Sequence, residues 1–502
     1  MPNPTSLAEF IATFERVEHH HPWSRVEVDA AGWEIATSHL ATGAWTLSGL
    51  WGDSQAVHMA VLDAFGLAVL TLPCPDRTFP SVAARHPPAI RLERSIRDLF
   101  GIEPQGSPDT RPWLDHGCWG LRHPLGDHVS DSIAAPYPFL SAEGDSLHQI
   151  AVGPVHAGVI EPGHFRFHAN GETIVRLEAR LGYTHKGVEK LLQGATIERA
   201  AKLAGRVSGD STVSYAIAFA RAIEAALKVE VPPRAHWLRA LMAELERLAN
   251  HFGDIGAICN DAAFALMHAH CAVLRERVLR AADACFGHRL MRDCVIPGGA
   301  ALDLPSPKVD VLRALLTEIG QRFPALVELY DNTASLQDRT VSTGVLSAEL
   351  ARQFGAGGYV GRASGRSFDA RRALSYPPYD QLAFEVPVLA EGDVNARVWI
   401  RIREVEQSLS LIDQLLSRLP EGPIRIVLPI AAAEGIAIVE GFRGDILAWV
   451  RLENDGTVAR CHLRDPSWFQ WPLLEAVIAG NIVADFPICN KSFNCSYSGH
   501  DL

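Results

Sequence analysis

Residues 235–252 read AHWLRALMAELERLANHF, and this stretch decides the fold class. Its apolar residues recur every three or four positions, as they do on one face of a helix: Trp237, Leu238, Leu241, Met242, Leu245 and Leu248. Residues 398–419 repeat the pattern, and Pro420 and Gly422 end it. Two long amphipathic helices predict a mainly helical core in which their apolar faces are buried.

Strand-like stretches lie on both sides of these helices. Residues 44–50 (AWTLSGL) and 66–73 (GLAVLTLP) are typical of half-buried and buried strands, and the chain from about residue 423 returns to such runs. Residues 151–180 alternate polar and apolar residues, with turn signals at Pro162-Gly163 and Asn170-Gly171. We therefore expect an α+β protein: a small α+β unit followed by a mainly helical unit with β-rich margins.

Composition places the chain among globular proteins and excludes some functions. Of 502 residues, 48% are hydrophobic and 21% charged, and 46 basic against 58 acidic residues give a net charge of −12. Because broad nucleic-acid binding needs a basic surface, we expect no nucleic-acid partner. We also expect no signal peptide, and no membrane span at residues 424–439, where Arg425, Pro429 and Glu434 interrupt the apolar run.

The cysteines and the histidine run suggest no metal site. The nine cysteines include no CxxC pair, which favours buried, reduced thiols in a cytoplasmic protein. His19, His20 and His21 lack flanking residues at zinc-ligand spacing, so we expect them on the surface.

Several segments, in one collinear order, resemble a known family. Residues 79–116 (FPSVAARHPPAIRLERSIRDLFGIEPQGSPDTRPWLDH) are similar to the C-type subunit of respiratory complex I. Residues 153–167 (GPVHAGVIEPGHFRF) and 181–190 (LGYTHKGVEK) resemble its D-type subunit and the large subunit of membrane-bound nickel–iron hydrogenases. The resemblance implies a fused C/D-type chain: a C-like domain at 1–122, a linker at 123–150 and a D-like or hydrogenase-like domain at 151–502.

The sequence departs from the hydrogenases at the nickel ligands. The resemblance implies four thiolates, from one CxxC in a stretch like RVCGIC and one in a terminal stretch like SLDPCYSC. Here residues 206–211 read RVSGDS and residues 492–499 read SFNCSYSG, so the four ligand positions hold Ser208, Ser211, Ser496 and Gly499. A serine hydroxyl stays protonated near neutral pH and binds soft metals weakly. We therefore expect no nickel–iron centre and no hydrogenase activity.

A different metal site is a lesser alternative. It would use the residues that remain near those positions, which are Cys489, Cys495, His500 and Asp210. Such a site requires both the ligand count and the geometry to be right.

The resemblance to complex I implies a quinone site in the same place. A histidine and a tyrosine of the D-type subunit supply protons to the quinone, and an aspartate orients the histidine. The histidine corresponds to His156 or His164 and the aspartate to Asp261, whereas Gly209 replaces the tyrosine. Tyr215 and Tyr497 are the tyrosines that could approach this space instead.

Each of these residues also has a purely structural interpretation. His156 and His164 could be structural histidines of a β-turn region, and Asp261 could be the N-cap of a helix over AAFALMHAH. Arg362, in the RASG stretch, could serve the cavity as a cofactor-binding charge or form a salt bridge with Asp369 or Glu385. Ser208 and Ser211 could form a polar lining that holds water.

The leading hypothesis is a subunit of a complex-I-like, membrane-bound oxidoreductase related to the energy-converting hydrogenases. The resemblance implies three kinds of partner: a B-type small iron–sulfur subunit, a ferredoxin-like subunit and ion-translocating membrane subunits. The chain itself would bind no cofactor, with an iron–sulfur cluster in a partner, a possible quinone and the NADH site on other subunits. It would lie at the cytoplasmic face of the membrane, peripherally through its partners. The alternatives are a catalytically dead coupling scaffold and, last, a hydrogenase with unusual ligands.

Overall fold

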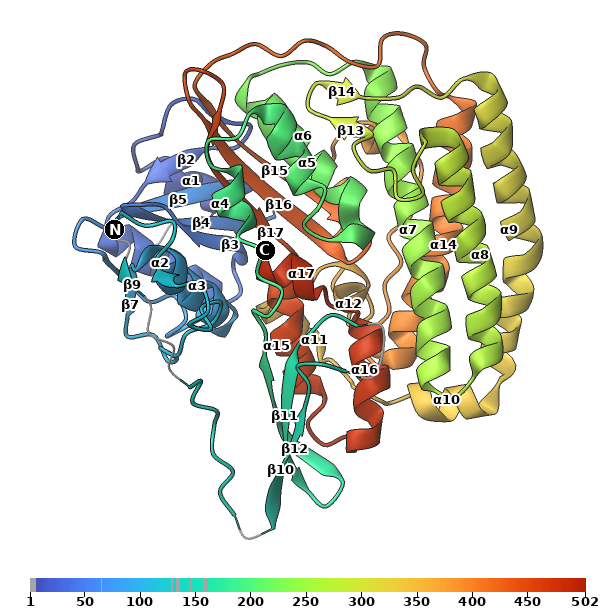
Figure 1. Ribbon diagram of the computed structural model, residues 1–502, viewed down its shortest axis with the longest axis horizontal. Coiled ribbons are helices and arrows are strands. Elements are labelled where there is room, and N and C mark those ends of the chain that lie inside the picture. The colour runs from blue at the N-terminus through green and yellow to red at the C-terminus, as the bar shows by residue number, and fades with distance from the viewer. Residues whose placement is uncertain (1–5, 65, 128–129, 132–135, 145, 157–159) are drawn as a thin grey trace.

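The N-terminal part of the chain is built around a four-stranded sheet (Figure 1). The structure is a computed structural model, and it describes residues 6–64, 66–127, 130–131, 136–144, 146–156 and 160–502. The sheet order is β2 (Arg25–Glu27), β5 (Leu67–Pro73), β4 (Ala56–Leu62) and β3 (Thr46–Gly52). The other elements of this part are α1 (Leu7–Ile11), α2 (Ala30–Ala41), β6 (Thr78–Pro80), η1 (Pro87–Ala89), α3 (Ile90–Phe100) and β7 (Glu103–Gln105). The strands predicted at 44–50 and 66–73 are confirmed as β3 and β5.

A long connection leads from this sheet to a projecting antiparallel sheet, at the bottom of Figure 1. The connection contains β8 (Leu121–Arg122) and β9 (Ser130–Asp131). The projecting sheet consists of β10 (Leu147–Val152), β11 (His164–Asn170) and β12 (Thr173–Arg180). Strands β11 and β12 meet at the predicted Asn170-Gly171 turn, where the positive φ of 59° favours glycine.

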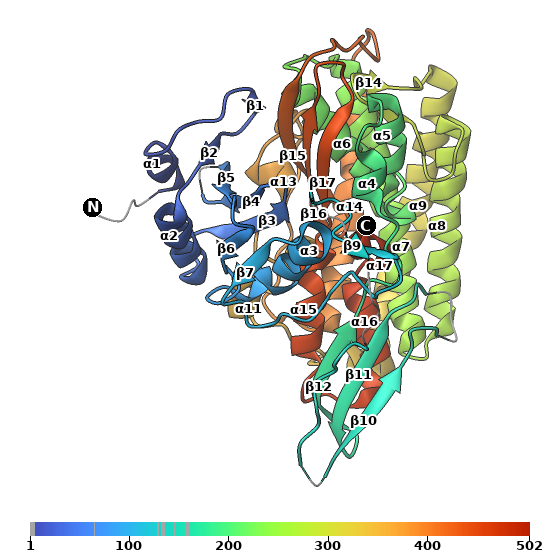
Figure 2. The same cartoon turned by 60° about the vertical axis from the view of Figure 1, so that its left-hand side comes forward.

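Four long helices lie side by side and form the helical core (Figures 1 and 2). They are α7 (Pro233–Asp261), α8 (Ala265–Phe286), α9 (Ser306–Asn332) and α14 (Val394–Ser417), so the two predicted amphipathic helices are confirmed as α7 and α14. Shorter helices precede and separate them: α4 (Val188–Leu192), α5 (Ile197–Ala204), η2 (Gly209–Ser211), α6 (Thr212–Ala226), α10 (Ala334–Thr340), α11 (Ala348–Gln353), α12 (Gly358–Arg362), α13 (Ala370–Ala373) and η3 (Tyr379–Gln381). A two-stranded ribbon joins β13 (Val295–Ile296) to β14 (Gly299–Ala300).

The C-terminal sheet lies between the N-terminal sheet and the helices (Figure 2). Its order is β1 (His20–His21), β15 (Ala433–Gly441), β16 (Gly444–Leu452) and β17 (Val458–Arg464). Helix α6 packs on it so closely that a Cβ at Gly435 would lie 2.2 Å from the carbonyl oxygen of Ala222. On the N-terminal side, Trp51 of β3 lies 5.6 Å from Trp449 of β16, between ring centroids. The chain then forms α15 (Ser467–Val477), η4 (Val483–Asp485), α16 (Phe486–Phe493) and α17 (Tyr497–Asp501).

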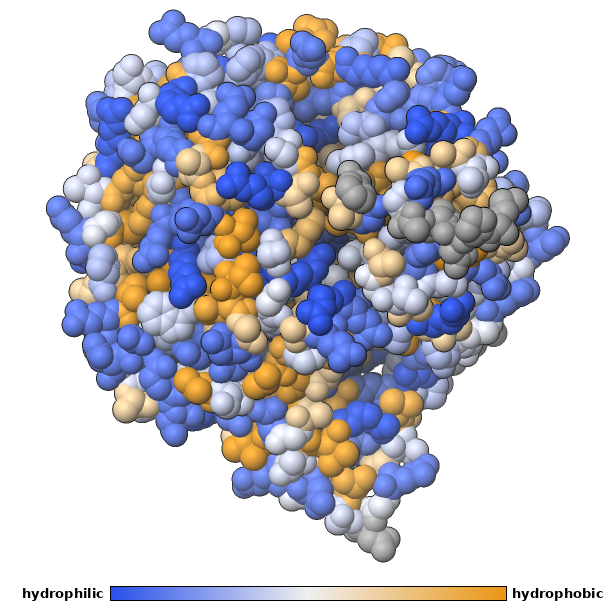
Figure 3. Space-filling model, turned by 180° about the vertical axis from the view of Figure 1, so that it is seen from behind, coloured by the Kyte–Doolittle hydropathy of each residue, from blue (hydrophilic) through white to orange (hydrophobic). Residues whose placement is uncertain are grey.

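The run at 424–439 is not helical, because its second half belongs to strand β15. Within the described part of the chain, no helix is long and apolar enough to cross a membrane. The face seen in Figure 3 alternates apolar clusters with hydrophilic side chains.

The prediction that residues 19–21 form a surface run is wrong for His20. This side chain is buried, and its Nδ1 lies 2.6 Å from the carbonyl oxygen of Trp23. The cause is β1, which pairs in parallel with β15 and places His20 Nε2 3.7 Å from Glu434. The prediction of buried, unpaired cysteines agrees with the structure for eight of the nine: all nine thiols are free, and only Cys118 is exposed.

The predicted domain boundaries remain predictions.

Candidate functional site

The structure brings together the positions that the sequence matches to the nickel ligands. Ser208 directly precedes the short η2 turn, Ser211 is its last residue, and Ser496 caps the N-terminus of α17. The Oγ atoms of Ser208 and Ser496 lie 3.1 Å apart, although 288 residues separate them in the chain. The backbone N–H of Gly499 donates to Ser496 Oγ at 2.8 Å. The matched positions therefore converge on one buried point.

An ion pair completes this arrangement. Arg443, from the turn between β15 and β16, donates to Asp210 from Nη1 at 2.9 Å and from Nη2 at 2.5 Å. Arg443 Nη1 also lies 3.2 Å from Ser211 Oγ, and Ser208 Oγ donates to Asp210 Oδ1 at 2.7 Å. We call Ser208, Asp210, Ser211, Arg443 and Ser496 the serine cluster. Sequence reasoning missed Arg443, for which the only signal was an arginine in a tight turn between apolar strands.

The hydroxyl groups of the cluster form a directed chain. Ser208 donates its single hydroxyl hydrogen to Asp210, so Ser496 is the donor in the contact between the two serines. Burial alone raises the pKa of Asp210, but the charge of Arg443 outweighs burial and lowers this pKa to about 2. The chain from Ser496 to Asp210 therefore ends on a carboxylate.

The two predicted histidines, His156 and His164, each form a hydrogen bond with a backbone carbonyl oxygen near the other histidine. His156 Nε2 lies 2.8 Å from the carbonyl oxygen of Gly163, and His164 Nδ1 lies 3.2 Å from that of Gly153. Because carbonyl oxygens only accept, both ring nitrogens donate. Burial lowers the pKa of His164, and its Nε2 is buried with no hydrogen-bond partner among the described residues. In His164, Nδ1 is thus used in the hydrogen bond to Gly153, while Nε2 can still accept a hydrogen bond or a proton.

The loop between these histidines also meets the C-terminal segment. Glu161 Oε2 accepts from the N–H of Ser498 at 3.1 Å, and a Cβ at Gly163 would lie 2.5 Å from the Tyr497 ring. The other tyrosine, Tyr215, donates its hydroxyl to Asp465 Oδ2 at 2.7 Å. That same oxygen would lie 2.4 Å from a Cβ at Gly499, so Tyr215 reaches the edge of the serine cluster through Asp465.

Asp261 lies elsewhere, at the last residue of α7. The alternative that it caps the following helix is wrong, because α8 begins at Ala265 and its N-cap is Phe264. Burial raises the pKa of Asp261, and the charge of Lys491 opposes this effect. No contact joins Asp261 to His156 or His164 among the described residues.

Arg362 is fully buried in a network of charges. Its guanidinium lies 2.7 Å from Glu404, 2.9 Å from Glu440 and 3.5 Å from Asp369. The predicted salt bridge to Asp369 is therefore confirmed. The alternative partner, Glu385, instead donates its backbone N–H to the Gln407 side chain at 2.9 Å.

The network extends along α7 and α14. His251 Nε2 lies 2.7 Å from Glu404, and Arg371 lies 3.0 Å from Glu244 and 2.7 Å from Asp369. We call the following set the charge network: Glu244, His251, Arg362, Asp369, Arg371, Glu404 and Glu440. Burial alone raises the pKa of Glu404, but the charge of Arg362 and the bond from His251 bring it well below its usual range. Sequence reasoning missed Glu404 because its partners Arg362 and His251 lie 42 and 153 positions away in the chain, and no local pattern links them to it.

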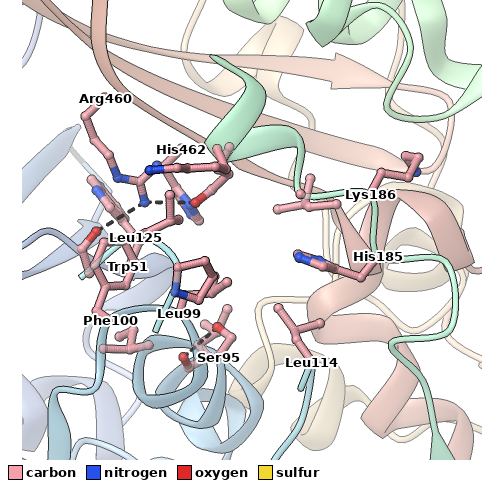
Figure 4. Close-up of a pocket in the computed structure, with 18 of the residues that line it drawn as sticks. Trp51, Ser95, Leu99, Phe100, Leu114, Leu125, His185, Lys186, Arg460 and His462 are labelled. Carbon is pink, nitrogen blue, oxygen red and sulfur yellow. Dashed lines mark hydrogen bonds and ion pairs between the residues drawn. The ribbon is translucent and has the colours of Figure 1, made fainter. Parts of the chain in front are cut away.

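A largely apolar pocket of about 390 Å³ opens between the N-terminal sheet and the C-terminal segment (Figure 4). We call it the junction pocket. Its walls include Trp51, Leu99, Phe100, Leu114, Leu125, His185, Leu191, Arg460 and His462. Lys186 also lines it and donates from Nζ to the carbonyl oxygen of Val207 at 3.2 Å, directly before Ser208. The junction pocket and the serine cluster are thus neighbours.

The residues proposed for a different metal site do not form one. Among the described residues, no group of three or more His, Cys, Asp or Glu side chains could hold a metal ion. Burial raises the pKa of Cys489 to about 12, and burial also raises that of Cys495. His500 Nδ1 is bonded to Asp501 at 2.8 Å.

Comparison with known proteins relates this chain to respiratory and hydrogen-metabolising enzymes. Residues 261–432 match the family "Respiratory-chain NADH dehydrogenase, 49 Kd subunit", residues 44–130 match the 30 Kd subunit, and residues 186–253 match "Nickel-dependent hydrogenase". Formate hydrogenlyase subunit 5 of Escherichia coli (strain K12) is 32% identical over 84% of this chain and 77% of its own length. Hydrogenase-4 component G of the same strain is 30% identical over 91% and 82%. The D-type subunit of NADH-quinone oxidoreductase from Syntrophobacter fumaroxidans is 31% identical over 70% and 95%.

Proposed function

This chain belongs to the family of fused complex I 30 kDa and 49 kDa subunits and hydrogenase large subunits, and on that premise we propose that it works without a nickel–iron centre. It is an oxidoreductase subunit of the complex-I-like, hydrogenase-4 group. Its proposed place is the cytoplasmic face of a membrane, where partner subunits hold it.

The observation that carries the proposal is the 3.1 Å contact between Ser208 and Ser496. These hydroxyls occupy the positions that match thiolates in nickel-carrying relatives, and hydroxyl oxygen is a poor ligand for a soft metal centre. Arg443 and Asp210 satisfy the remaining polar atoms, which supports a protein-filled position.

The proposed reaction is reduction of a quinone-like acceptor beside an iron–sulfur cluster of a partner. Such a reduction consumes two protons, which local groups must supply. His164 is the better of the two histidines for relaying such a proton, since its Nδ1–H is bonded to Gly153 and its Nε2, buried without a partner in the described part of the chain, can take up a proton and pass it on. His156 and Arg362 hold the loop and the core in place, and Asp261 lies at the far end of α7.

The junction pocket is the proposed docking place of the small iron–sulfur subunit. An electron donor has to lie close to its acceptor, and Lys186 links this pocket to the backbone beside Ser208. Mostly apolar walls with a few polar groups are typical of the buried centre of a protein interface. A ferredoxin-like subunit and ion-translocating membrane subunits complete the proposed assembly.

The docking proposal is tested with two exposed leucines. Leu191 lines the junction pocket and is 46% exposed, whereas Leu266 lies on α8 and is 54% exposed. Leu191→Glu should abolish co-purification of the iron–sulfur subunit, and the matched control Leu266→Glu should leave it unchanged. Equal co-purification with both variants would refute the docking place.

The proposed chemistry is tested on the purified complex by metal analysis together with assays of hydrogen oxidation and quinone reduction. Quinone reduction without nickel and without hydrogen oxidation is the expected result. One equivalent of nickel would instead identify a hydrogenase with unusual ligands.

A second candidate function is a coupling scaffold with no redox chemistry of its own. The closed contact between the two serines favours it, because that contact leaves no gap between the hydroxyls. It predicts an assembled complex in which His164→Ala does not change electron transfer, whereas the quinone proposal predicts a large loss.

A further inference from the structure

Glu246 differs from the other buried glutamates of α7 and α14. Glu244 and Glu404 each pair with arginines, but among the described residues no cation lies within ion-pair distance of Glu246. Its carboxyl group instead accepts from the N–H of Val213 at 2.6 Å and from the N–H and Oγ of Ser214 at 3.1 and 2.6 Å. A buried carboxyl group without a cation is costly to ionise.

A narrow cavity leads from Glu246 towards the surface. It has a volume of about 20 Å³, which is room for one water molecule. Its lining includes Gly209, Asp210, Glu246 and Asn250, together with exposed Arg275 and Arg289. Asn250 Nδ2 donates to the carbonyl oxygens of Asp210 and Glu246, at 2.8 and 2.9 Å. One side chain thus ties the η2 turn to α7 beside the cavity.

We propose that Glu246 is a proton-exchanging carboxyl group that connects the serine cluster to solvent through this cavity between α7 and α8. In the exchange, the O–H bond of Glu246 breaks and a new O–H bond forms on the cavity water. The carboxylate regains a proton when solvent protonates the same water. Beyond the cavity, Asp210 and the hydroxyls of Ser208 and Ser496 continue the hydrogen-bonded chain.

The electrostatic surroundings suit this role. Burial raises the pKa of Glu246 to about 7, more than the bonds from Ser214 and Val213 lower it, and the charge of Asp210 adds to the increase. Arg443 neutralises Asp210, and Arg275 and Arg289 face the cavity from the helix α8 side. A carboxyl group with a pKa near the working pH exchanges protons efficiently in both directions.

The competing explanation is that Glu246 only caps the N-terminus of α6, to which Val213 and Ser214 belong. Glu246→Gln separates the two roles, because the amide oxygen can still accept both bonds from Ser214, whereas the NH2 group loses only the bond from Val213 and cannot carry the proton. Thermal unfolding of this variant checks that the cap survives.

The test is difference infrared spectroscopy of the isolated chain between about pH 5 and pH 9. The wild type should show a protonated carboxyl band that titrates near neutral pH, shifts promptly in D2O and is absent from Glu246→Gln. A second titrating band from Glu440, whose pKa burial also raises to about 7, should remain in that variant. An unchanged spectrum in Glu246→Gln would overturn the proposal.

A cavity-filling variant tests the route itself. Ala282 lines the cavity and is buried, whereas its neighbour Ala281 does not line it. Ala282→Val should slow the deuterium shift of the Glu246 band several-fold, and Ala281→Val should not. Exchange at the wild-type rate in Ala282→Val would exclude this cavity as the route.

The use of this proton in quinone reduction rests on the proposed function, whereas the proton exchange between Glu246 and solvent does not. In the assembled complex, Glu246→Gln should lower quinone reduction and flatten its pH profile. If the wild-type complex reduces no quinone, the proposed function fails, while the infrared titration and the deuterium exchange still decide the role of Glu246.

Discussion

The serine cluster and the charge network are both buried and polar, but they are built differently. In the charge network each arginine contacts at least two carboxylates, as Arg362 does with Glu404 and Glu440. In the serine cluster one ion pair is surrounded by neutral hydroxyls, and a cavity adjoins it. The comparison teaches that the charge network joins the helices to the sheet through shared carboxylates, while the serine cluster joins its segments through one ion pair and hydroxyl groups beside a small cavity.

The largest effect is expected from removing the centre of the charge network. Arg362→Met leaves Glu404, Glu440 and Asp369 without their shared cation, and breaking a buried pair costs about 3–5 kcal/mol. Arg443→Met leaves only one carboxylate without its cation, that of Asp210, which is half-buried. Denaturant unfolding should therefore show a larger loss for Arg362→Met, and equal losses would remove the distinction between the two regions.

The two regions should also respond to pH in opposite directions. Burial, with the charge of Asp369, raises the pKa of Glu440 from 4.5 to about 7, so its contribution is fully present below about pH 4.5 and is lost as pH rises through 7. The pKa of Asp210 falls to about 2, so its contribution is present above about pH 4 and is lost as pH falls to 2.

The Glu440 effect is roughly 3 kcal/mol, and the Asp210 effect is smaller because solvent screens its half-buried side chain. Thermal unfolding followed against pH should lose its slope between about pH 4.5 and 7 in Glu440→Gln, and its slope below about pH 4 in Asp210→Asn. A slope that stays in place in its own variant would contradict the assignment.

Two glycines provide a matched test of packing around the serine cluster. A Cβ at Gly499 would lie 2.4 Å from Asp465 Oδ2 and 2.8 Å from Ser496 Oγ, whereas a Cβ at Gly209 meets only Arg292 Nη2, at 3.8 Å. Gly499→Ala should therefore lower the free energy of unfolding by about 1–3 kcal/mol. Gly209→Ala should be close to neutral, and a cost as large as that of Gly499→Ala would show that the η2 turn is packed as tightly as the start of α17.

The smallest effects are expected from single hydroxyls. Ser408 donates to Glu244 in the charge network at 2.7 Å, and Ser208 donates to Asp210 at 2.7 Å. Ser408→Ala and Ser208→Ala should each cost about 1 kcal/mol. Denaturant unfolding checks both, with Ser408→Ala expected to cost more because its carboxylate is fully buried. The reverse order would mean that the serine cluster is the more rigid region.

Local sequence patterns predicted the elements well. The amphipathic periods at 235–252 and 398–419 became α7 and α14, because an apolar stripe has to be buried wherever the helix packs. The helices extend beyond those limits, to Asp261 and back to Val394, because capping and neighbouring helices set the ends. The burial of His20 could not be predicted, since it depends on β15, more than 400 residues away.

The candidate site was predicted in part. Resemblance located the positions of Ser208 and Ser496, but no local pattern marked Arg443 or Glu246 as their neighbours. Asp261, matched on resemblance, has no described contact with the histidines; it is the last residue of α7, and the charge of Lys491 on α16 acts on it.

The sequence by itself determined which chemistry is available: hydroxyl oxygen instead of thiolate sulfur at residues 208, 211 and 496, because the residue type alone sets ligand softness and protonation. Only the tertiary structure decided which charges meet, such as Arg443 with Asp210 and Arg362 with Glu404. The physical reason is that electrostatic and hydrogen-bond energies depend on distances of a few ångströms and on burial, and folding sets both for residues far apart in the chain.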